Sequence, residues 1–287
     1  MNTTEKSGSS LEFDANWRNR PESYNNYWIA QEPVNQIQLA FRMHWHLFSE
    51  LIGGVNAKRC LEVGCGRGSI SSYFAANGCD CTLLDTSSNV LQIARQIFHN
   101  SGHIGRFVTG DANHLPFPSN TFDVVVSIGL LEHFKNVVQP IHEQIRVLRP
   151  SGIFLGYIVP EQPDNIQKYF RWLNFFLKII SQAFGISASS VTKTPIYRND
   201  FGSERYLPIL IKEKVVSIEA MGVYPLPMIS HSPEFPFSLL PAFWEKLLTK
   251  VFSISLTIRR SLSGRNPWIC QEKTGQAFLV VCRKREG

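Results

Sequence analysis

The chain has 287 residues and a mass of 32.6 kDa, which is enough for one substantial hydrophobic core and favours one elaborated domain over two. Hydrophobic residues make up 44% of it and charged residues 18%, a composition that excludes a disordered chain. The formal net charge is +6, but the basic residues are scattered apart from a short cluster at 283–285. The charge therefore permits contact with an anionic surface, and we expect no nucleic-acid partner.

Cysteine usage and hydropathy indicate a cytoplasmic protein. The six cysteines form no C-x-x-C pair, so reduced thiols are expected. Residues 1–10 are polar and lack the apolar segment of a secretory signal. No uninterrupted apolar run reaches the ~18–20 residues that a membrane-spanning helix needs.

The first element in the chain is a predicted helix at 33–54. Pro33 suits its first turn, and Gly53 and Gly54 end it. Apolar residues recur at helical spacing between them. Residues 1–54 are therefore predicted to form a tail and a cap helix ahead of a larger domain at 55–287.

After residue 55, short apolar segments alternate with amphipathic ones. Strands that alternate with helices predict an α/β fold with a parallel sheet and right-handed crossovers. The predicted strands lie at about 59–63, 80–85, 104–109, 122–129 and 153–159, with helices or loops between them.

The last third of the chain departs from this alternation. We predict a helix at 206–222, a strand at 222–226 and a final strand at 277–284. Two long insertions, at about 160–205 and 230–273, are rich in apolar and aromatic residues. If the strand near 224 runs parallel to the others, both insertions leave from the carboxyl edge of the sheet, where open α/β sheets bind ligands. They are therefore candidates for a helical lid.

A glycine-rich turn, "LEVGCGRG" at 61–68, follows the first predicted strand and opens a helix. Strand, glycine turn and helix together bring a ligand against bare backbone at a helix N-terminus. The fingerprint of NAD and FAD binders has glycine or alanine at the position that Ser69 occupies, so this turn departs from that pattern.

Four segments in order resemble the class I S-adenosylmethionine (SAM) methyltransferases, and within them the type 11 group of small-molecule enzymes. The segments are "LEVGCGRG", "LLDTS", "GDANHLPFPSNTFDVVVS" and "VLRPSGIFLG", and the resemblance covers about 55–160. It implies a Rossmann-like, doubly wound, mostly parallel seven-stranded sheet with an antiparallel last strand. It also implies SAM as cofactor and S-adenosylhomocysteine as product.

The residues agree with a SAM site. SAM carries no phosphate, so its turn must allow close backbone approach, which a Cβ at Gly64 or Gly66 would obstruct. Asp85 can accept hydrogen bonds from both ribose hydroxyls. The resemblance assigns the adenine amino group to Asp111 and a ring contact to the Ala112 backbone. In the alternative interpretation, Asp85 caps the next helix and Asp111 caps a turn.

Glu62 is expected to orient the glycine turn or the SAM ammonium group. Cys65 is interpreted as a small residue that fits between two glycines, since no electropositive surroundings indicate a reactive thiol. The full set of predicted cofactor-binding residues is Glu62, Gly64, Cys65, Gly66, Gly68, Asp85, Thr86, Asp111, Ala112, Ile128 and Gly129.

Two polar residues follow the fourth strand, where the resemblance places groups that face the substrate. His133 is the candidate general base because its unperturbed pKa lies near neutrality; the alternative is packing under a lid or capping the next helix. Glu132 is a weaker catalytic candidate and is expected to interact with a helix N-terminus. His44 and His46 point to different faces of a helix, and we predict no metal site.

The insertions determine what is expected of the acceptor. A predicted helix at 164–185, capped by Asp164 or Asn165, is apolar over most of its circumference. It must pack on two sides, line an apolar cavity or dip into a membrane interface. We therefore predict an apolar or aromatic acceptor. The candidate lining residues are Tyr27, Trp28, Trp172, Phe176 and Trp244.

Three functions remain open at this point. The first is a SAM-dependent methyltransferase that acts on a small, fairly hydrophobic acceptor. The second is a peripheral-membrane lipid or quinone methyltransferase, and the third is a SAM-binding partner subunit without catalysis. The sequence names neither the acceptor atom nor the oligomeric state.

Overall fold

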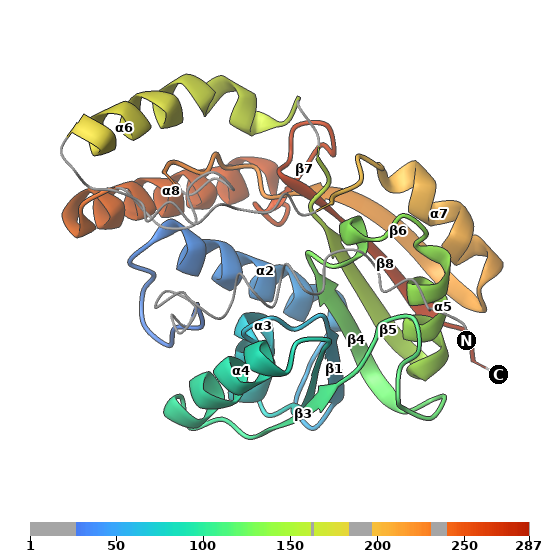
Figure 1. Ribbon diagram of the computed structural model, residues 1–287. Coiled ribbons are helices and arrows are strands. Elements are labelled where there is room, and N and C mark those ends of the chain that lie inside the picture. The colour runs from blue at the N-terminus through green and yellow to red at the C-terminus, as the bar shows by residue number, and fades with distance from the viewer. Residues whose placement is uncertain (1–26, 162–163, 184–196, 231–239, 287) are drawn as a thin grey trace, which may run out of the picture.

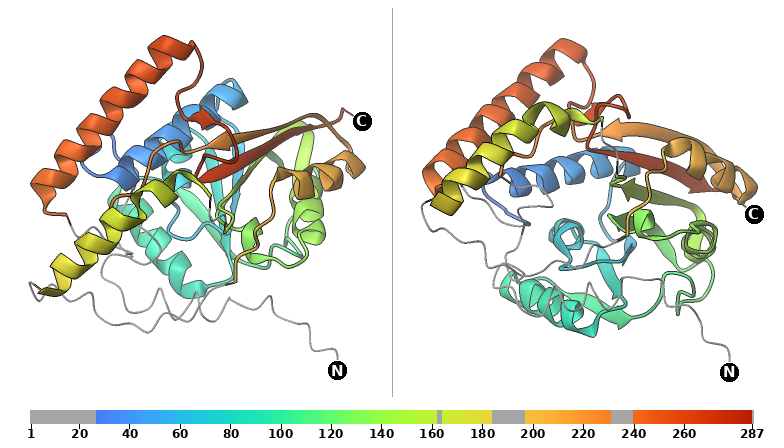
Figure 2. Two further views of the ribbon diagram at one scale, coloured as in Figure 1. Left: turned by 90° about the horizontal axis from the view of Figure 1, so that it is seen from above. Right: turned by 45° about the horizontal axis from the view of Figure 1, so that its top comes forward.

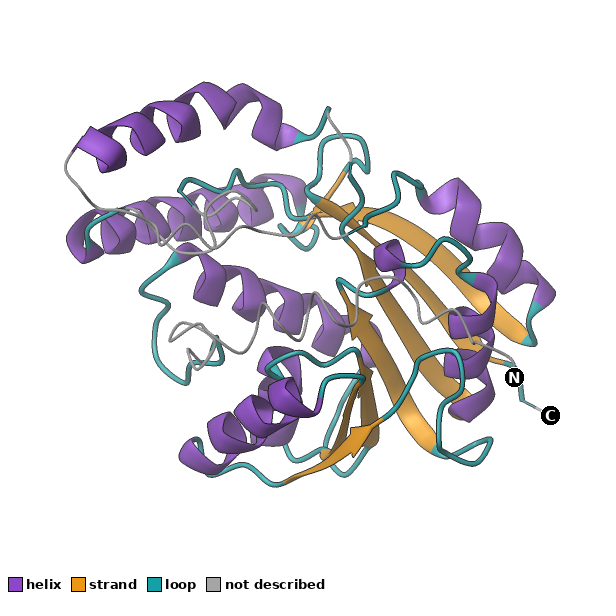
Figure 3. Ribbon diagram, viewed as in Figure 1, coloured by secondary structure: helices purple, strands orange, loops and turns teal. Residues whose placement is uncertain are grey.

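A computed structural model of the chain describes residues 27–161, 164–183, 197–230 and 240–286. Most of the predicted tail, and parts of both predicted insertions, lie outside these residues. The described chain forms an eight-stranded sheet with helices on both faces (Figures 1 and 3). The strands are β1 (Arg59–Val63), β2 (Asp80–Asp85), β3 (Gly105–Thr109), β4 (Phe122–Ile128), β5 (Leu148–Ile158), β6 (Val215–Val223), β7 (Ile269–Cys270) and β8 (Ala277–Lys284).

The strand order is β3-β2-β1-β4-β5-β8-β6-β7. Strands β1 to β5 pair in parallel, whereas β8 is antiparallel to both β5 and β6. This confirms the predicted Rossmann-like, mostly parallel sheet with an antiparallel last strand. The short β7, which pairs antiparallel with β6 at the sheet edge, was not predicted from the sequence.

The sheet separates the core into two layers, and helices cover each of its faces. Buried residues of α2, α3 and α4 pack on one face, and those of α5 and α7 pack on the other. The helices are α2 (Gln36–Ile52), α3 (Ser69–Ala76), α4 (Ser88–Asn100), α5 (Val138–Val147), α6 (Arg171–Ala183), α7 (Ser203–Lys212) and α8 (Ala242–Ser263), with 3₁₀ turns η2 (Leu131–His133) and η3 (Ile166–Phe170).

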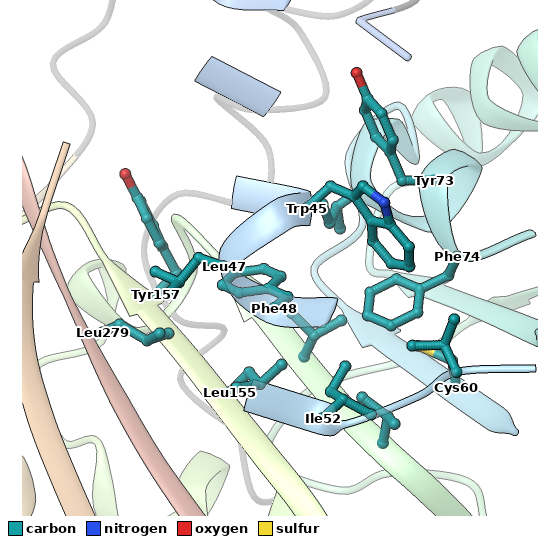
Figure 4. Packing of buried hydrophobic residues seen from close by; sticks show 14 of the residues in the cluster. Trp45, Leu47, Phe48, Ile52, Cys60, Tyr73, Phe74, Leu155, Tyr157 and Leu279 are labelled. Atoms are coloured by element: carbon teal, nitrogen blue, oxygen red, sulfur yellow. The ribbon is translucent and has the colours of Figure 1, made fainter. Parts of the chain in front are cut away.

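Helix α2 is the predicted cap helix, although it begins later than expected. Asn35 caps it, since its side-chain oxygen accepts a hydrogen bond from the backbone N–H of Gln38. Pro33 therefore lies before the helix rather than in its first turn. Figure 4 shows how α2 packs: Phe48 is fully buried, and the Trp45 ring meets Phe74 of α3 edge-on at 5.1 Å.

The prediction of one long helix at 206–222 followed by a strand at 222–226 is wrong. Helix α7 ends at Lys212, and β6 already begins at Val215. The reason is pairing with β8: Val215 lies opposite Lys284, and Val223 lies opposite Ala277. Tertiary pairing of β-branched residues here outweighs the helical spacing of the apolar positions.

The direction of β6 fixes where the insertions leave the sheet. Because β5 and β6 are both antiparallel to β8, they run parallel to each other. The segments that follow Ile158 and Val223 therefore leave from the same carboxyl edge, as predicted. Helix α6 belongs to the first of these segments and α8 to the second (Figure 2).

Candidate active site

The glycine turn sits between the ends of β1 and β2. The backbone N–H groups of Gly64 and Cys65 both donate to the carbonyl oxygen of Leu84, at 2.8 and 2.9 Å. Gly64 and Gly68 have φ angles of 69° and 73°, in the left-handed region that favours glycine. A Cβ on Gly64 would come within 2.7 Å of the Leu130 side chain, and one on Gly68 within 2.5 Å of Leu83. The turn therefore packs tightly on the segments that flank it.

A cavity of about 310 Å³ opens beside this turn, at the carboxyl ends of the parallel strands. Its size is in the range of small-molecule sites. All of the predicted cofactor-binding residues except Gly68 line it. Gly68 instead provides the N-cap of α3.

Asp85 ties the glycine turn to the end of β2. One of its carboxylate oxygens accepts from the Gly66 N–H and the other from the Ser87 N–H, each at 3.0 Å. The cap of α4 is Ser87, whose hydroxyl accepts from Val90 N–H at 3.1 Å. The alternative that Asp85 itself caps this helix is therefore wrong, and its carboxylate lines the cavity.

Asp111 combines both interpretations made from the sequence. Its Oδ1 accepts from the backbone N–H of Asn113 at 2.9 Å and from the Asn113 side chain at 3.0 Å, so it does cap a turn. The residue also lines the cavity next to the buried Ala112. Capping holds this carboxylate at the cavity wall.

Glu62 is buried at the base of the cavity. Its carboxyl group accepts from the backbone N–H and the hydroxyl of Ser71, which links β1 to α3. Burial raises the pKa of Glu62 to about 8, although the bonds from Ser71 oppose this shift. The group is therefore mostly protonated at neutral pH, and a cation bound nearby would favour its ionised form.

Two aromatic residues from the N-terminal part of the described chain lie at the cavity. Tyr27 and Phe41 line it, and their rings stack at 5.5 Å. The guanidinium carbon of Arg67 lies 4.5 Å from the centre of the Tyr27 ring, so a residue of the glycine turn contacts this aromatic pair directly. Phe41 and Arg67 were not predicted as site residues, whereas Tyr27 was.

His133 lies on η2 and also lines the cavity. Its Nδ1 is 2.7 Å from the carbonyl oxygen of Tyr197. Burial lowers the pKa of His133 to about 4, although the carbonyls of Tyr197 and Gly129 oppose this shift. The ring is therefore neutral at pH 7 and donates from Nδ1 to Tyr197, which fixes its tautomer.

Comparisons with known proteins agree with this geometry. Residues 61–156 match the model of a family described as "Methyltransferase domain". A fatty-acid O-methyltransferase of Mycolicibacterium smegmatis is 40% identical over 115 residues, which are 37% of this chain and 41% of the relative. A demethylmenaquinone methyltransferase of Clavibacter sepedonicus is 34% identical over 155 residues, or 52% and 60% of the two chains.

Residues 61–156 of this chain form a methyltransferase domain of the class I, SAM-dependent type. The match spans less than two thirds of either relative. The fold of the whole domain resembles the crystal structure of the YcgJ protein from Bacillus subtilis, with a TM-score of 0.56 at 20% identity over 86% of this chain and all of that one. Family membership implies the use of SAM.

The cavity of the methyltransferase domain fits that cofactor. The Asp85 carboxylate lies beside the glycine turn, where it can accept from ribose hydroxyls, and Asp111 and Ala112 lie together on the wall. Glu62 offers a carboxyl group to an ammonium. Burial raises the pKa of Cys65 well above its usual range, in line with a small packing residue rather than a reactive thiol.

No sequence motif indicated the segment that holds η2 in place. The backbone N–H of Asn199 donates to the carbonyl of Glu132 at 2.7 Å, and its side-chain amide donates to that of Phe134 at 3.2 Å. Two residues before Asn199, the carbonyl oxygen of Tyr197 accepts from His133 Nδ1. The returning end of the first insertion thus positions η2, and the only sequence signal was a loop-like "YRND" at 197–200.

Glu132 lies behind this turn and does not line the cavity. The side chain is fully buried, and among the described residues neither oxygen has a hydrogen-bond partner of good geometry. Burial raises its pKa to about 7, and Arg198 opposes the shift. It belongs to η2 itself and precedes the first residue of α5 by six positions, so the described geometry does not place it at that helix terminus.

Most of the other predicted lining residues lie outside the cavity. Trp28 packs edge-on against His103, with ring centres 4.6 Å apart. Trp172, Phe176 and Trp244 are 68%, 55% and 56% exposed. The reason is that α6 and α8 bury other positions, so that these aromatic side chains face away from the core.

His44 and His46 do not form a metal site with other residues of the described chain. His44 is buried and accepts from the Trp268 indole N–H at 2.9 Å, whereas His46 is exposed. Burial lowers the pKa of His44 to about 3. Within the described ranges, no group of three or more His, Cys, Asp or Glu residues is placed to hold a metal ion.

Proposed function

We propose that this protein transfers the methyl group of SAM to a small, fairly hydrophobic acceptor. The observation that carries the proposal is a single cavity with two unlike walls. One part of the lining is the glycine turn with Asp85, and another holds a neutral imidazole, His133, next to Phe134. The relatives that are named for fatty-acid and demethylmenaquinone methylation support an apolar acceptor.

On the cofactor side, Asp85 would hold the ribose, Asp111 and Ala112 the adenine, and Glu62 the ammonium of the methionine part. When bound, SAM supplies a methyl group that its sulfonium already activates. The chain therefore needs to align the acceptor with that methyl group and to exclude water. Tyr27 and Phe41 cover the cavity and serve the second task.

On the acceptor side, His133 would remove a proton. Its lowered pKa keeps the ring neutral at pH 7, and the Tyr197 carbonyl holds its orientation. A hydroxyl or thiol acceptor needs such a base, whereas an amine or enolate does not. Removal of a proton by His133 would therefore fit O- or S-methylation.

Calorimetry and a transfer assay test the proposal in two steps. SAM and S-adenosylhomocysteine should bind, and NAD and FAD should give no heat. The protein is then incubated with SAM labelled in its methyl group and with a fatty acid, a demethylated quinone or a simple phenol as acceptor. Label should enter at least one acceptor with the native chain and should be lost with His133→Ala.

The outcomes separate the alternatives. Binding of NAD without SAM would overturn the cofactor assignment. SAM binding without transfer to any apolar or polar acceptor would favour the non-catalytic SAM-binding subunit. Transfer that persists in His133→Ala would exclude His133 as the general base, while the proposal of a methyltransferase would stand.

A further inference from the structure

Helix α8 presents a continuous apolar stripe to the outside. Leu247, Val251, Ile254, Ile258 and Leu262 recur every three or four residues, and their exposed fractions lie between 43% and 83%. Such spacing places them on one face of a helix. The residues of α8 that are buried are Glu245, Thr249 and Leu256, which recur at similar spacing on the other face.

Helix α6 repeats this arrangement. Its exposed apolar residues are Trp172, Phe175, Phe176, Ile179 and Ile180, and its buried residue is the polar Asn174. An apolar exterior around a polar buried position reverses the usual pattern of a surface helix. We call the exposed apolar side chains of α6 and α8 named here the insertion face.

Polar contacts hold both helices in these orientations. The buried Glu245 accepts from the backbone N–H of Gln36 at 2.9 Å, which fixes α8 on α2. The Asn174 amide donates to the Met228 carbonyl at 3.0 Å and accepts from the Ser230 N–H at 2.9 Å. Figures 1 and 2 show that α6 and α8 lie on the same side of the molecule, beyond α2. The insertion face is therefore built into the fold rather than left by loose packing.

The charges beside the insertion face have one sign. Apart from the buried Glu245, every charged residue of α6 and α8 is basic, namely Arg171, Lys178, Lys246, Lys250, Arg259 and Arg260. On the helical repeat, Lys246 and Lys250 fall on the flank of the α8 stripe. An apolar face with a cationic flank complements a surface that is apolar inside and anionic outside.

We propose that the insertion face docks on an anionic lipid membrane, with α6 and α8 lying in the headgroup region. In the described part of the chain no helix is long and apolar enough to cross a membrane, so docking in the plane of the surface is the mode that fits. A second copy is a poorer partner, because a two-fold interface through this face would set basic residues against basic residues. The proposal does not depend on methyl transfer.

Vesicle co-sedimentation tests the docking directly. The native full-length chain should pellet with vesicles of phosphatidylglycerol and phosphatidylcholine, less with phosphatidylcholine alone, and less at raised ionic strength. The double variant Ile254→Gln, Ile258→Gln should weaken binding roughly tenfold or more, since two apolar side chains no longer enter the interface. The matched control is Ile104→Gln, Ile211→Gln, two exposed isoleucines elsewhere, which should bind as the native chain does.

A charge-reversed pair tests the flank separately. Lys246→Glu, Lys250→Glu should lose the preference for anionic vesicles, and Lys212→Glu, Lys214→Glu should keep it. Each variant is first checked for binding of S-adenosylhomocysteine by calorimetry, so that a misfolded chain is recognised. Native protein that stays in the supernatant, or equal loss in the test and control variants, would overturn the proposal. Sedimentation velocity is the second measurement: a dimer that Ile254→Gln, Ile258→Gln dissociates, without vesicle binding, would mean that the face joins two copies.

Discussion

The two walls of the cavity are built in different ways. The cofactor wall comes from the ends of β1 and β2, and its residues are joined by contacts such as that of Asp85 with Gly66 within one strand–turn–helix unit and the next strand. The acceptor wall holds His133, which a distant segment positions: the Tyr197 carbonyl accepts from its Nδ1, and the Asn199 N–H donates to the Glu132 carbonyl. Local geometry therefore dictates the first wall, whereas the second exists only after the sheet and the insertions have packed.

The strongest way to break the cofactor wall is Asp85→Ala. It should weaken SAM and S-adenosylhomocysteine binding by roughly 1.5–3 kcal/mol for each charge-assisted hydrogen bond that the ribose loses. The loss of the Gly66 contact adds to this effect because the turn is released. Asp80→Ala, at the other end of β2 and on the surface, is the calorimetric control. An unchanged affinity in Asp85→Ala would mean that Asp85 does not bind the ribose.

Behind the acceptor wall, the burial of Glu132 carries a cost in stability that can be measured against pH. The folded pKa of Glu132, about 7, lies above its ordinary value of 4.5, so its contribution to the unfolding free energy is fully present below about pH 4.5 and is lost as pH rises through 7. The loss is on the order of 3 kcal/mol. Glu132→Gln should remove this part of the pH dependence. The free energy of unfolding of the variant should therefore rise relative to that of the native chain between pH 5 and pH 8.

Urea denaturation at several pH values measures this difference. Glu219→Gln, at an exposed position of β6, is the control and should follow the native profile. Parallel curves for the native chain and Glu132→Gln would mean that the carboxyl group is ionised and compensated in the folded state.

The difference between the walls also explains what the sequence could predict. Gly64 and Asp85 were predicted because each lies at a strand end, where open α/β sheets bind ligands, and Asp111 because its segment resembles the family's adenine-side motif. Tyr197 acts through its own backbone carbonyl, which accepts from His133 Nδ1, and Asn199 donates to the Glu132 carbonyl. Almost any sequence provides such carbonyls. Beside the site, β6 was misplaced for a similar reason, because its pairing with β8 lies in tertiary structure.

The same reasoning applies to the aromatic residues of the insertions. Trp172 and Trp244 were expected at the cavity because both insertions leave from the carboxyl edge of the sheet and could keep water from the transfer step. Their orientation follows instead from two buried polar residues. Glu245 bonds to α2, and Asn174 bonds to the 228–230 segment. A hydropathy pattern does not show which face of a mostly apolar helix its polar contacts will bury.

Asn199→Ala should separate the two walls in one measurement. Loss of its amide contact to the Phe134 carbonyl loosens η2 and with it His133, so turnover should fall roughly tenfold to a hundredfold. The affinity for S-adenosylhomocysteine should stay within about twofold, since the cofactor wall is untouched. Asn100→Ala, an exposed amide at the end of α4, is the matched variant and should change neither quantity. Equal losses of turnover and cofactor affinity in Asn199→Ala would mean that the two walls are not independent.

The smallest effect concerns protons at the cofactor wall. With a pKa of about 8, Glu62 holds its proton at pH 7 before ligand binds, and the ammonium of SAM would stabilise the carboxylate. Binding should therefore release up to about one proton, which appears as a dependence of the calorimetric enthalpy on the ionisation enthalpy of the buffer. Adenosine lacks the ammonium group and should bind without this release, and Glu62→Gln should abolish it for SAM. If Glu62→Gln releases as many protons as the native chain, the ammonium lies elsewhere in the cavity, and Glu62 serves only to hold Ser71 and the start of α3.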